Sequence, residues 1–191
     1  MNHIHLEKKG LRGLAIAESF KPDANFSRLT GVVIRRDFII DGFVFGKCTV
    51  EGDDATDAIL DMYFRLNRDD ISYIMISGLV IAMYNIINIK KIWENTQIPI
   101  IGVTYEESGE IDDAIRHHFP NSYSSKIEQY HSLGKRTEIT LHTGYKLYLR
   151  TEGCLLEDAK KILDSVTMQG AMPEPVRVAQ LLAKTSLSFS T

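Results

Sequence analysis

The strongest constraint on the fold is a stretch of 19 residues without any charge, ISYIMISGLVIAMYNIINI at 71–89. A stretch of this length could span a lipid bilayer as a helix. However, Gly78 interrupts it, and the β-rich run YIMI before the glycine is typical of a strand. We therefore expect a buried strand, a turn and the start of a helix, and no association with a membrane.

The composition is that of a globular domain, with 44% hydrophobic and 25% charged residues among 191. The 22 basic and 25 acidic side chains give a formal charge of −3. This charge excludes a protein that binds nucleic acid through bulk positive charge, although it allows a local basic groove. Cys48 and Cys154 form no CxxC motif, which favours a reducing, cytoplasmic setting. We expect one domain over residues 1–191, with frayed ends at 1–8 and 188–191.

The periodicity of the first half predicts three strands followed by a helix. The three apolar runs cover residues 11–19, 29–37 and 38–50. Only Arg36 and Asp37 separate the cores of the last two runs, which predicts a tight hairpin. Over residues 54–68 the apolar spacing changes to that of a helix.

Strands and helices then alternate along the chain. We expect a strand at 70–78, a helix at 87–96 and a strand at 98–107. Three hairpin-connected strands followed by such alternation is the order of an RNase H-like mixed α/β sheet, with right-handed parallel crossovers. Further helices are expected at 111–119, 125–134, 156–166 and 173–187, with two short strands within 138–151.

The segment TVEGDDATDAIL, at 49–60, places an acidic cluster at the start of the first helix. The cluster consists of Glu51, Asp53, Asp54 and Asp57. In one interpretation Asp54 is the N-cap and Asp57 completes a capping box at the positive end of the helix dipole. In the other, the cluster is half of a Mg²⁺ site, because Mg²⁺ prefers oxygen ligands and usually takes one or two carboxylates plus substrate phosphate.

Several segments of the chain resemble one known family. They are LAIAESF, TGVVIRRD, TVEGDDATDAI, IMISG with AMYNIINI, IPIIGVT, GYKLYLR and PEPVRVAQLLA. Together they are similar to the endonuclease V-like proteins called endonuclease dU, over about residues 11–184. The resemblance implies an RNase H-like fold and cleavage of DNA at a deaminated base, deoxyuridine in particular, with Mg²⁺ or Mn²⁺ as cofactor.

The resemblance also implies site residues. Asp54 and Asp57 occupy the family's acids in the element VEGDDATD, and Asn85 matches the asparagine after the fourth strand. In the first strand, where members commonly carry two adjacent acids, this chain has Ala17 followed by Glu18. We therefore expect Glu18, Asp54 and Asp57 to bind the metal, and Asn85 to orient water or phosphate.

The direction of the Glu18 side chain decides whether it can replace the missing acid. Successive strand residues point to opposite faces of a sheet. Glu18 faces away from the site if the strand continues beyond Ala17, and can turn into it if the strand ends there. The fourth strand offers no replacement, because Ser77 stands where endonuclease V has another aspartate. Glu106 and Glu107 either complete an acidic pole or precede and cap the next helix.

Three residues are candidate contacts to DNA. Arg36 lies at the expected hairpin tip, and Tyr145 and Lys146 follow Gly144 in a turn, where a tyrosine can stack on a displaced base. The resemblance thus implies a metal-dependent endonuclease that acts on uracil-containing DNA. The alternative, prompted by Ala17, is a catalytically impaired RNase H-like module that binds nucleic acid or protein. The sequence leaves the oligomeric state open, a homo-oligomer included.

Overall fold

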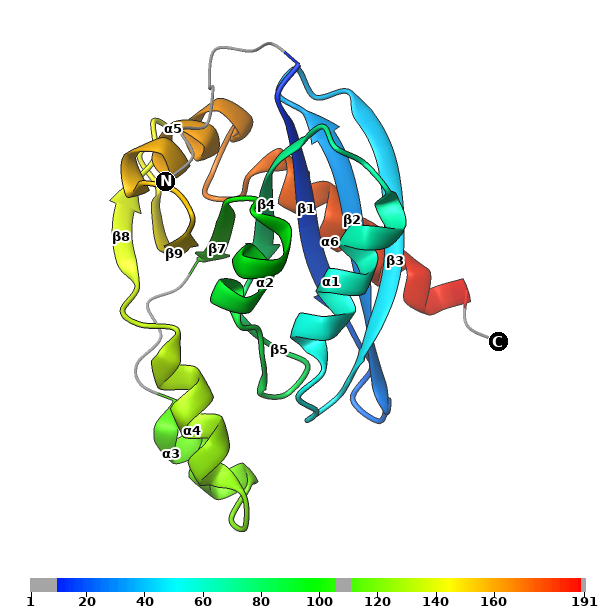
Figure 1. Ribbon diagram of the computed structural model, residues 1–191, viewed down its shortest axis with the longest axis vertical. Helices are drawn as coiled ribbons and strands as arrows, with labels where there is room; N and C mark the ends of the chain where they lie inside the picture. The colour runs from blue at the N-terminus through cyan, green and yellow to red at the C-terminus, as the bar shows by residue number, and fades with distance from the viewer. Residues whose placement is uncertain (1–9, 106–110, 190–191) are drawn as a thin grey trace.

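A seven-stranded mixed sheet with helices on both faces forms the body of the molecule (Figure 1). The computed structural model describes residues 10–105 and 111–189. The strands of the sheet are β1 (Arg12–Ser19), β2 (Phe26–Arg35), β3 (Ile40–Thr49), β4 (Ile71–Ser77), β7 (Ile100–Thr104), β8 (Thr137–Thr140) and β9 (Lys146–Glu152). Their order is β3-β2-β1-β4-β7-β9-β8, with parallel pairing of β1 with β4 and of β4 with β7. The predicted mixed α/β sheet is confirmed.

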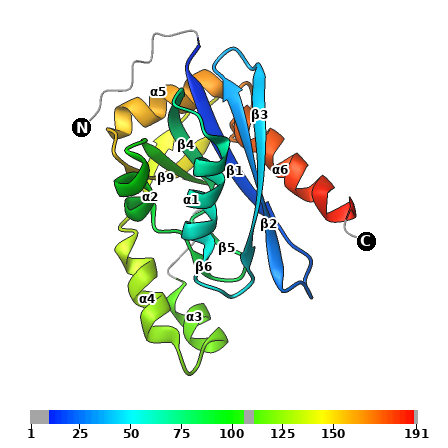
Figure 2. The same ribbon diagram turned by 45° about the vertical axis from the view of Figure 1, so that its right-hand side comes forward.

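Helices cover both faces of this sheet (Figure 2). One face, here called the α1 face, carries α1 (Ala55–Leu66) and α2 (Ile89–Thr96). The other, the α6 face, carries α5 (Leu156–Val166) and α6 (Glu174–Ser186), and a 3-10 turn (Leu187–Phe189) follows. The helices α3 (Asp112–His118) and α4 (Tyr123–Ser132) form a hairpin that projects beyond one end of the sheet (Figure 1).

The central strand β1 contributes to both layers of the core because its side chains alternate between the faces. Ile16 packs on the α1 face, and Ala17 packs on the α6 face. On that second face, the hydroxyl of Thr30 in β2 donates to the carbonyl of Ala179 in α6 at 2.7 Å. The small Ala17 side chain leaves room for α6 to approach β1 closely.

The uncharged segment forms β4 and a two-stranded sheet of β5 (Val80–Ile81) and β6 (Asn85–Ile86). Residues 82–84 connect β5 to β6 with φ values of 43, 55 and 68°. The buried strand and the turn are confirmed, and the helix α2 begins only at Ile89, after its N-cap Asn88. Among the described residues, no helix is both long enough and apolar enough to cross a membrane.

The strand directions give the sheet two different ends. The parallel strands β1, β4 and β7 have their carboxyl ends at one of them, here called the carboxyl pole. The strand β3 also ends there, because it is antiparallel to β2, which is antiparallel to β1. In open α/β sheets, ligands bind outside the carboxyl ends of the strands. The carboxyl pole is therefore the place to look for a site.

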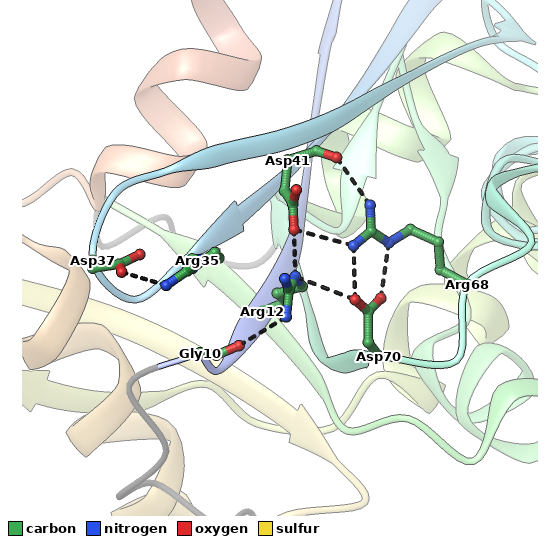
Figure 3. Close-up of polar contacts among 7 residues, drawn as sticks. All are labelled: Gly10, Arg12, Arg35, Asp37, Asp41, Arg68 and Asp70. Carbon is green, nitrogen blue, oxygen red and sulfur yellow. Dashed lines mark hydrogen bonds and ion pairs between the residues drawn. The ribbon is translucent and has the colours of Figure 1, made fainter.

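An ion-pair network of Arg12, Asp41, Arg68 and Asp70 closes the opposite end of the sheet (Figure 3). Arg68 donates to both carboxylate oxygens of Asp70, at 2.8 and 2.7 Å. It also donates to the Asp41 carbonyl at 2.9 Å, and Arg12 pairs with both carboxylates. The hydrogen bond from Arg12 holds the pKa of Asp41 below its usual value, and the one from Arg68 does the same for Asp70. The network joins β1, β3 and the loop before β4.

We expect Arg68→Lys to lower the free energy of unfolding by about 1 kcal/mol at pH 7, because an ammonium cannot form the bidentate pair. The lowered pKa values mean that the network stabilises the fold above the unfolded aspartate pKa of about 3.9. This stabilisation is lost as the pH falls through the folded-state pKa values. The unfolding free energies of Arg68→Lys and of the unaltered protein should therefore converge below about pH 4. Urea unfolding across this pH range measures the difference.

The matched control is Arg116→Lys, because Arg116 forms an exposed pair with Asp113 at 3.1 Å. This control should leave the unfolding free energy unchanged within a few tenths of a kcal/mol. An effect of Arg68→Lys no larger than that of the control would show that the network does not stabilise the fold.

Candidate functional site

Asp54 precedes α1 but does not cap it with its side chain. Its carboxylate turns back to the end of β3, where it accepts from the Thr49 amide at 2.9 and 3.1 Å and from the Thr49 hydroxyl at 2.7 Å. The side-chain amide of Asn85 donates to it at 2.8 Å. The capping-box interpretation of Asp54 is therefore wrong, because these bonds direct the carboxylate away from the helix.

Asn85 supplies the missing cap from β6. Its side-chain oxygen accepts from the Ala55 amide at 3.1 Å, and its amide nitrogen also donates to the Thr49 carbonyl at 2.9 Å. The residue is completely buried. A single side chain thus joins β6, the end of β3 and the first turn of α1.

Hydrogen bonding keeps Asp54 ionised. Its partial burial acts to raise the pKa of the carboxyl, but the bonds from Thr49 and Asn85 outweigh burial and hold the pKa below its usual value. The Asp54 carboxylate is therefore a fixed negative charge at the carboxyl pole at neutral pH.

Glu18 lies on the α1 face, because β1 continues to Ser19 and Ala17 faces α6. Its carboxylate accepts from the Ser27 hydroxyl and from the Ala82 amide, the latter at 3.4 Å. Burial, and then the charges of Asp54 and Glu18, raise the pKa of Cys48 to about 12. The structure thus brings two of the three predicted metal ligands into one neighbourhood, beside a protonated thiol.

The third predicted ligand, Asp57, points elsewhere. Its carboxylate is 65% exposed and pairs with the Lys91 ammonium at 2.6 Å, beside a hollow of about 240 Å³. The two remaining acids of the cluster also have separate partners, since Asp53 pairs with Lys126 at 2.9 Å and Glu51 with His118 at 2.7 Å. Within the described part of the chain, no three acidic, histidine or cysteine side chains are grouped to hold a metal ion.

Lys126 is a site residue that the sequence interpretation missed. Its side chain is 6% exposed, and its ammonium donates to the Gly52 carbonyl at 2.8 Å and to the Tyr84 carbonyl at 3.2 Å, besides Asp53. It also lies 4.9 Å from the Phe119 ring centroid. Lys126 thus anchors α4 to the two loops at the carboxyl pole. A lysine within an amphipathic helix gives no signal of such a role in the sequence.

The α6 face of the carboxyl pole carries the positions where the resemblance places the missing acids. Ala17 contributes a methyl group there, and the Ser77 hydroxyl accepts from Gln180 of α6 at 2.9 Å. The nearby Tyr105 hydroxyl is buried, and burial raises its pKa to about 12, opposed by Ser77 and by the charge of Arg177. None of the Ala17, Ser77 and Tyr105 side chains offers a carboxylate to a metal.

The three candidate DNA contacts fall at two places on opposite edges of the sheet. Arg36 lies in the turn between β2 and β3, at one edge of the sheet, whereas Tyr145 and Lys146 lie at the β8–β9 turn, at the other. Tyr145 is 57% exposed, and Lys146 pairs with Glu138 at 2.8 Å. Their contact with DNA stays a prediction. Glu106 and Glu107 lie outside the described residues.

We expect Asn85→Asp to lower the free energy of unfolding by about 3 kcal/mol at pH 7, because it places a second buried carboxylate against Asp54. Two adjacent carboxyls raise the pKa of one of them above its unfolded value. The folded variant then binds more protons than the unfolded chain, so its stability should recover as the pH falls towards about 4. Thermal unfolding between pH 4 and 8 measures this recovery.

Asn88→Asp is the matched control for this substitution. Asn88 accepts from the Lys91 amide at 2.9 Å as the N-cap of α2, and aspartate caps a helix equally well. Equal destabilisation by both variants would show that Asn85 is not the anchor of the pole.

Known proteins resemble this chain over nearly its whole length. The family described as Endonuclease dU matches residues 9–187. A UPF0215 protein of Pyrobaculum calidifontis is 37% identical over 171 residues, which cover 89% of this chain and 93% of that protein. A UPF0215 protein of Thermoplasma volcanium is 31% identical over 185 residues, which cover 96% of this chain and 93% of that protein.

Solved structures share the fold. A protein of unknown function from Archaeoglobus fulgidus has a TM-score of 0.80 and 26% identity, covering 92% of this chain and 98% of that one. Endonuclease V of Ciona intestinalis, in complex with a 24mer DNA containing an inosine followed by a ribo-adenosine, has a TM-score of 0.60 and 13% identity, covering 94% and 87%. The predicted RNase H-like fold is thereby confirmed. The chain belongs to the endonuclease dU family.

Proposed function

We propose that this chain binds deaminated, uracil-containing DNA and does not cleave it through a metal centre at the ends of β1 and β4. Family and fold both indicate a nuclease lineage, which supports nucleic acid as the ligand. The observation that carries the proposal is the pair of Ala17 and Ser77 on the α6 face, where the resemblance places acids.

The residues on that face do not fit a catalytic Mg²⁺ or Mn²⁺. Metal-assisted phosphodiester hydrolysis needs oxygen ligands, mainly carboxylates, arranged around the ion. The methyl group of Ala17 has no donor atom, and the Ser77 hydroxyl is already bonded to Gln180. Glu18 cannot replace the acid there, because it lies on the opposite face of the sheet.

A second candidate is the metal-dependent endonuclease itself, with Mg²⁺ or Mn²⁺ on the α1 face. It is favoured by the shared neighbourhood of Glu18 and Asp54, since the charges of both carboxylates raise the pKa of Cys48. In this candidate Glu18, Asp54 and Asp57 hold the metal, which requires Asp57 to leave Lys91. Asn85 then orients Asp54, to which it already donates.

A nicking assay separates the two candidates. A duplex with one uracil is incubated with Mg²⁺ or Mn²⁺ and run on a denaturing gel, while fluorescence anisotropy measures its binding against an undamaged duplex. We expect preferential binding of the uracil duplex and no cleavage above a metal-free control. If the unaltered protein cleaves the duplex and the Glu18→Gln variant, purified identically, does not, the proposal is overturned in favour of the second candidate. Equal binding of both duplexes would refute recognition of the lesion.

A restored acid pair tests which face could hold a metal. The double variant Ala17→Asp/Ser77→Asp places two carboxylates together, and their repulsion should lower the melting temperature without metal. Mn²⁺ should recover several degrees of this loss, as expected for an ion that binds only the folded state. Ser77→Asp alone serves as the control, because Gln180 can donate to either side chain. The same Mn²⁺ response in both variants would place the metal elsewhere.

A further inference from the structure

The α6 face carries exposed aromatic side chains on β2 and β3, the two outermost strands at one edge of the sheet. Phe43 and Phe45 of the edge strand β3 are 49% and 51% exposed, and Phe26 of β2 is 48% exposed. The pairing of Thr30 with Phe45 places Phe45 on the α6 face, since Thr30 bonds to α6. Large exposed apolar groups that share one face of a sheet indicate a binding surface.

Two cations lie in the same surface, between the phenylalanines. Arg28 and Lys47 are direct cross-strand partners, and both are exposed. The Lys47 ammonium lies 4.6 Å from the Phe26 ring centroid. Together the two side chains place positive charge within the aromatic surface, and this charge suits an anionic ligand.

Two carbonyls of the edge strand β3 already accept hydrogen bonds from arginines, so they are not available to an added strand. The Arg65 guanidinium donates to the Phe45 carbonyl at 2.7 Å, and Arg68 donates to the Asp41 carbonyl at 2.9 Å. A two-fold dimer with its axis close to the Arg28–Lys47 pair would bring this pair near its own copy, which like-charge repulsion opposes. Charge complementarity therefore favours a polyanion over a second copy of this chain.

We propose that this surface, formed by Phe26, Arg28, Phe43, Phe45 and Lys47, binds single-stranded nucleic acid. Bases stack on the phenylalanine rings, and phosphates lie at the two cations between them, an arrangement suited to sequence-independent binding. The proposal rests on the proposed function only in taking nucleic acid as the ligand class. It concerns a surface separate from the carboxylates around Cys48.

The test is anisotropy titration of a labelled, uracil-free single strand of about 12 nucleotides at about 50 mM salt. Phe43→Ala/Phe45→Ala should weaken binding at least about fivefold, because each lost stacking contact costs that much or more. The matched control is Phe64→Ala, since Phe64 is 57% exposed on α1 at the opposite face. This control should bind like the unaltered protein.

The electrostatic part of the proposal has its own readout. Lys47→Ser should lower the slope of log affinity against log salt by about 0.7, as expected for one lost phosphate contact on a single strand. Lys47→Arg should retain the slope. Lys90→Ser, at a 70% exposed side chain on α2, should leave it unchanged.

Several outcomes would overturn this proposal. The first is that the unaltered protein does not bind the single strand, and the second is that Phe64→Ala weakens strand binding as much as Phe43→Ala/Phe45→Ala does. The third is that sedimentation shows a dimer, which Phe43→Ala/Phe45→Ala dissociates while strand binding persists. The proposed function fails separately. If the uracil duplex is bound no better than an undamaged one, but Phe43→Ala/Phe45→Ala still weakens single-strand binding, the proposed lesion recognition is wrong. The proposal for the aromatic surface is then still supported.

Discussion

The buried amide of Asn85 is the interaction on which the carboxyl pole depends. It donates to the Asp54 carboxylate and the Thr49 carbonyl, and it accepts from the first amide of α1. A buried side-chain amide is stable only when its donors and acceptor are satisfied, so the three segments have to meet in one geometry. The position of Asp54, and with it the negative charge of the pole, follows from this bond set.

Successive side chains of β1 point to opposite faces of the sheet, so neighbouring residues of this strand belong to different sites. Ala17 belongs to the layer under α6, and Glu18 belongs to the layer near Cys48. Two adjacent acids, which the resemblance implies for this strand, would lie on opposite faces, and this strand has its one acid, Glu18, on the α1 face. A rotamer change of Glu18 therefore cannot bring a carboxylate to the α6 face, where Ser77 bonds to Gln180.

Much of the fold could be predicted because it depends on local periodicity. The apolar runs predicted β1 to β4 and β7, and the change to helical spacing predicted α1. The short β5–β6 hairpin was missed, because its turn uses three consecutive residues with positive φ and none of them is a glycine. The role of Asn85 as a cap was also missed, because a cap from another segment leaves no trace at a fixed sequence spacing.

By itself, the sequence determined the succession of the helices and of the seven strands of the main sheet, and the membership of the chain in the endonuclease dU family. Those properties depend on side-chain type and spacing along one segment. Only the tertiary structure decided that Glu18 and Asp54 share a neighbourhood while Asp57 pairs with Lys91, and that Phe43 and Phe45 stay uncovered beside α6. These properties depend on which distant segments come into contact. Those contacts result from packing and charge pairing between segments that are far apart in the sequence.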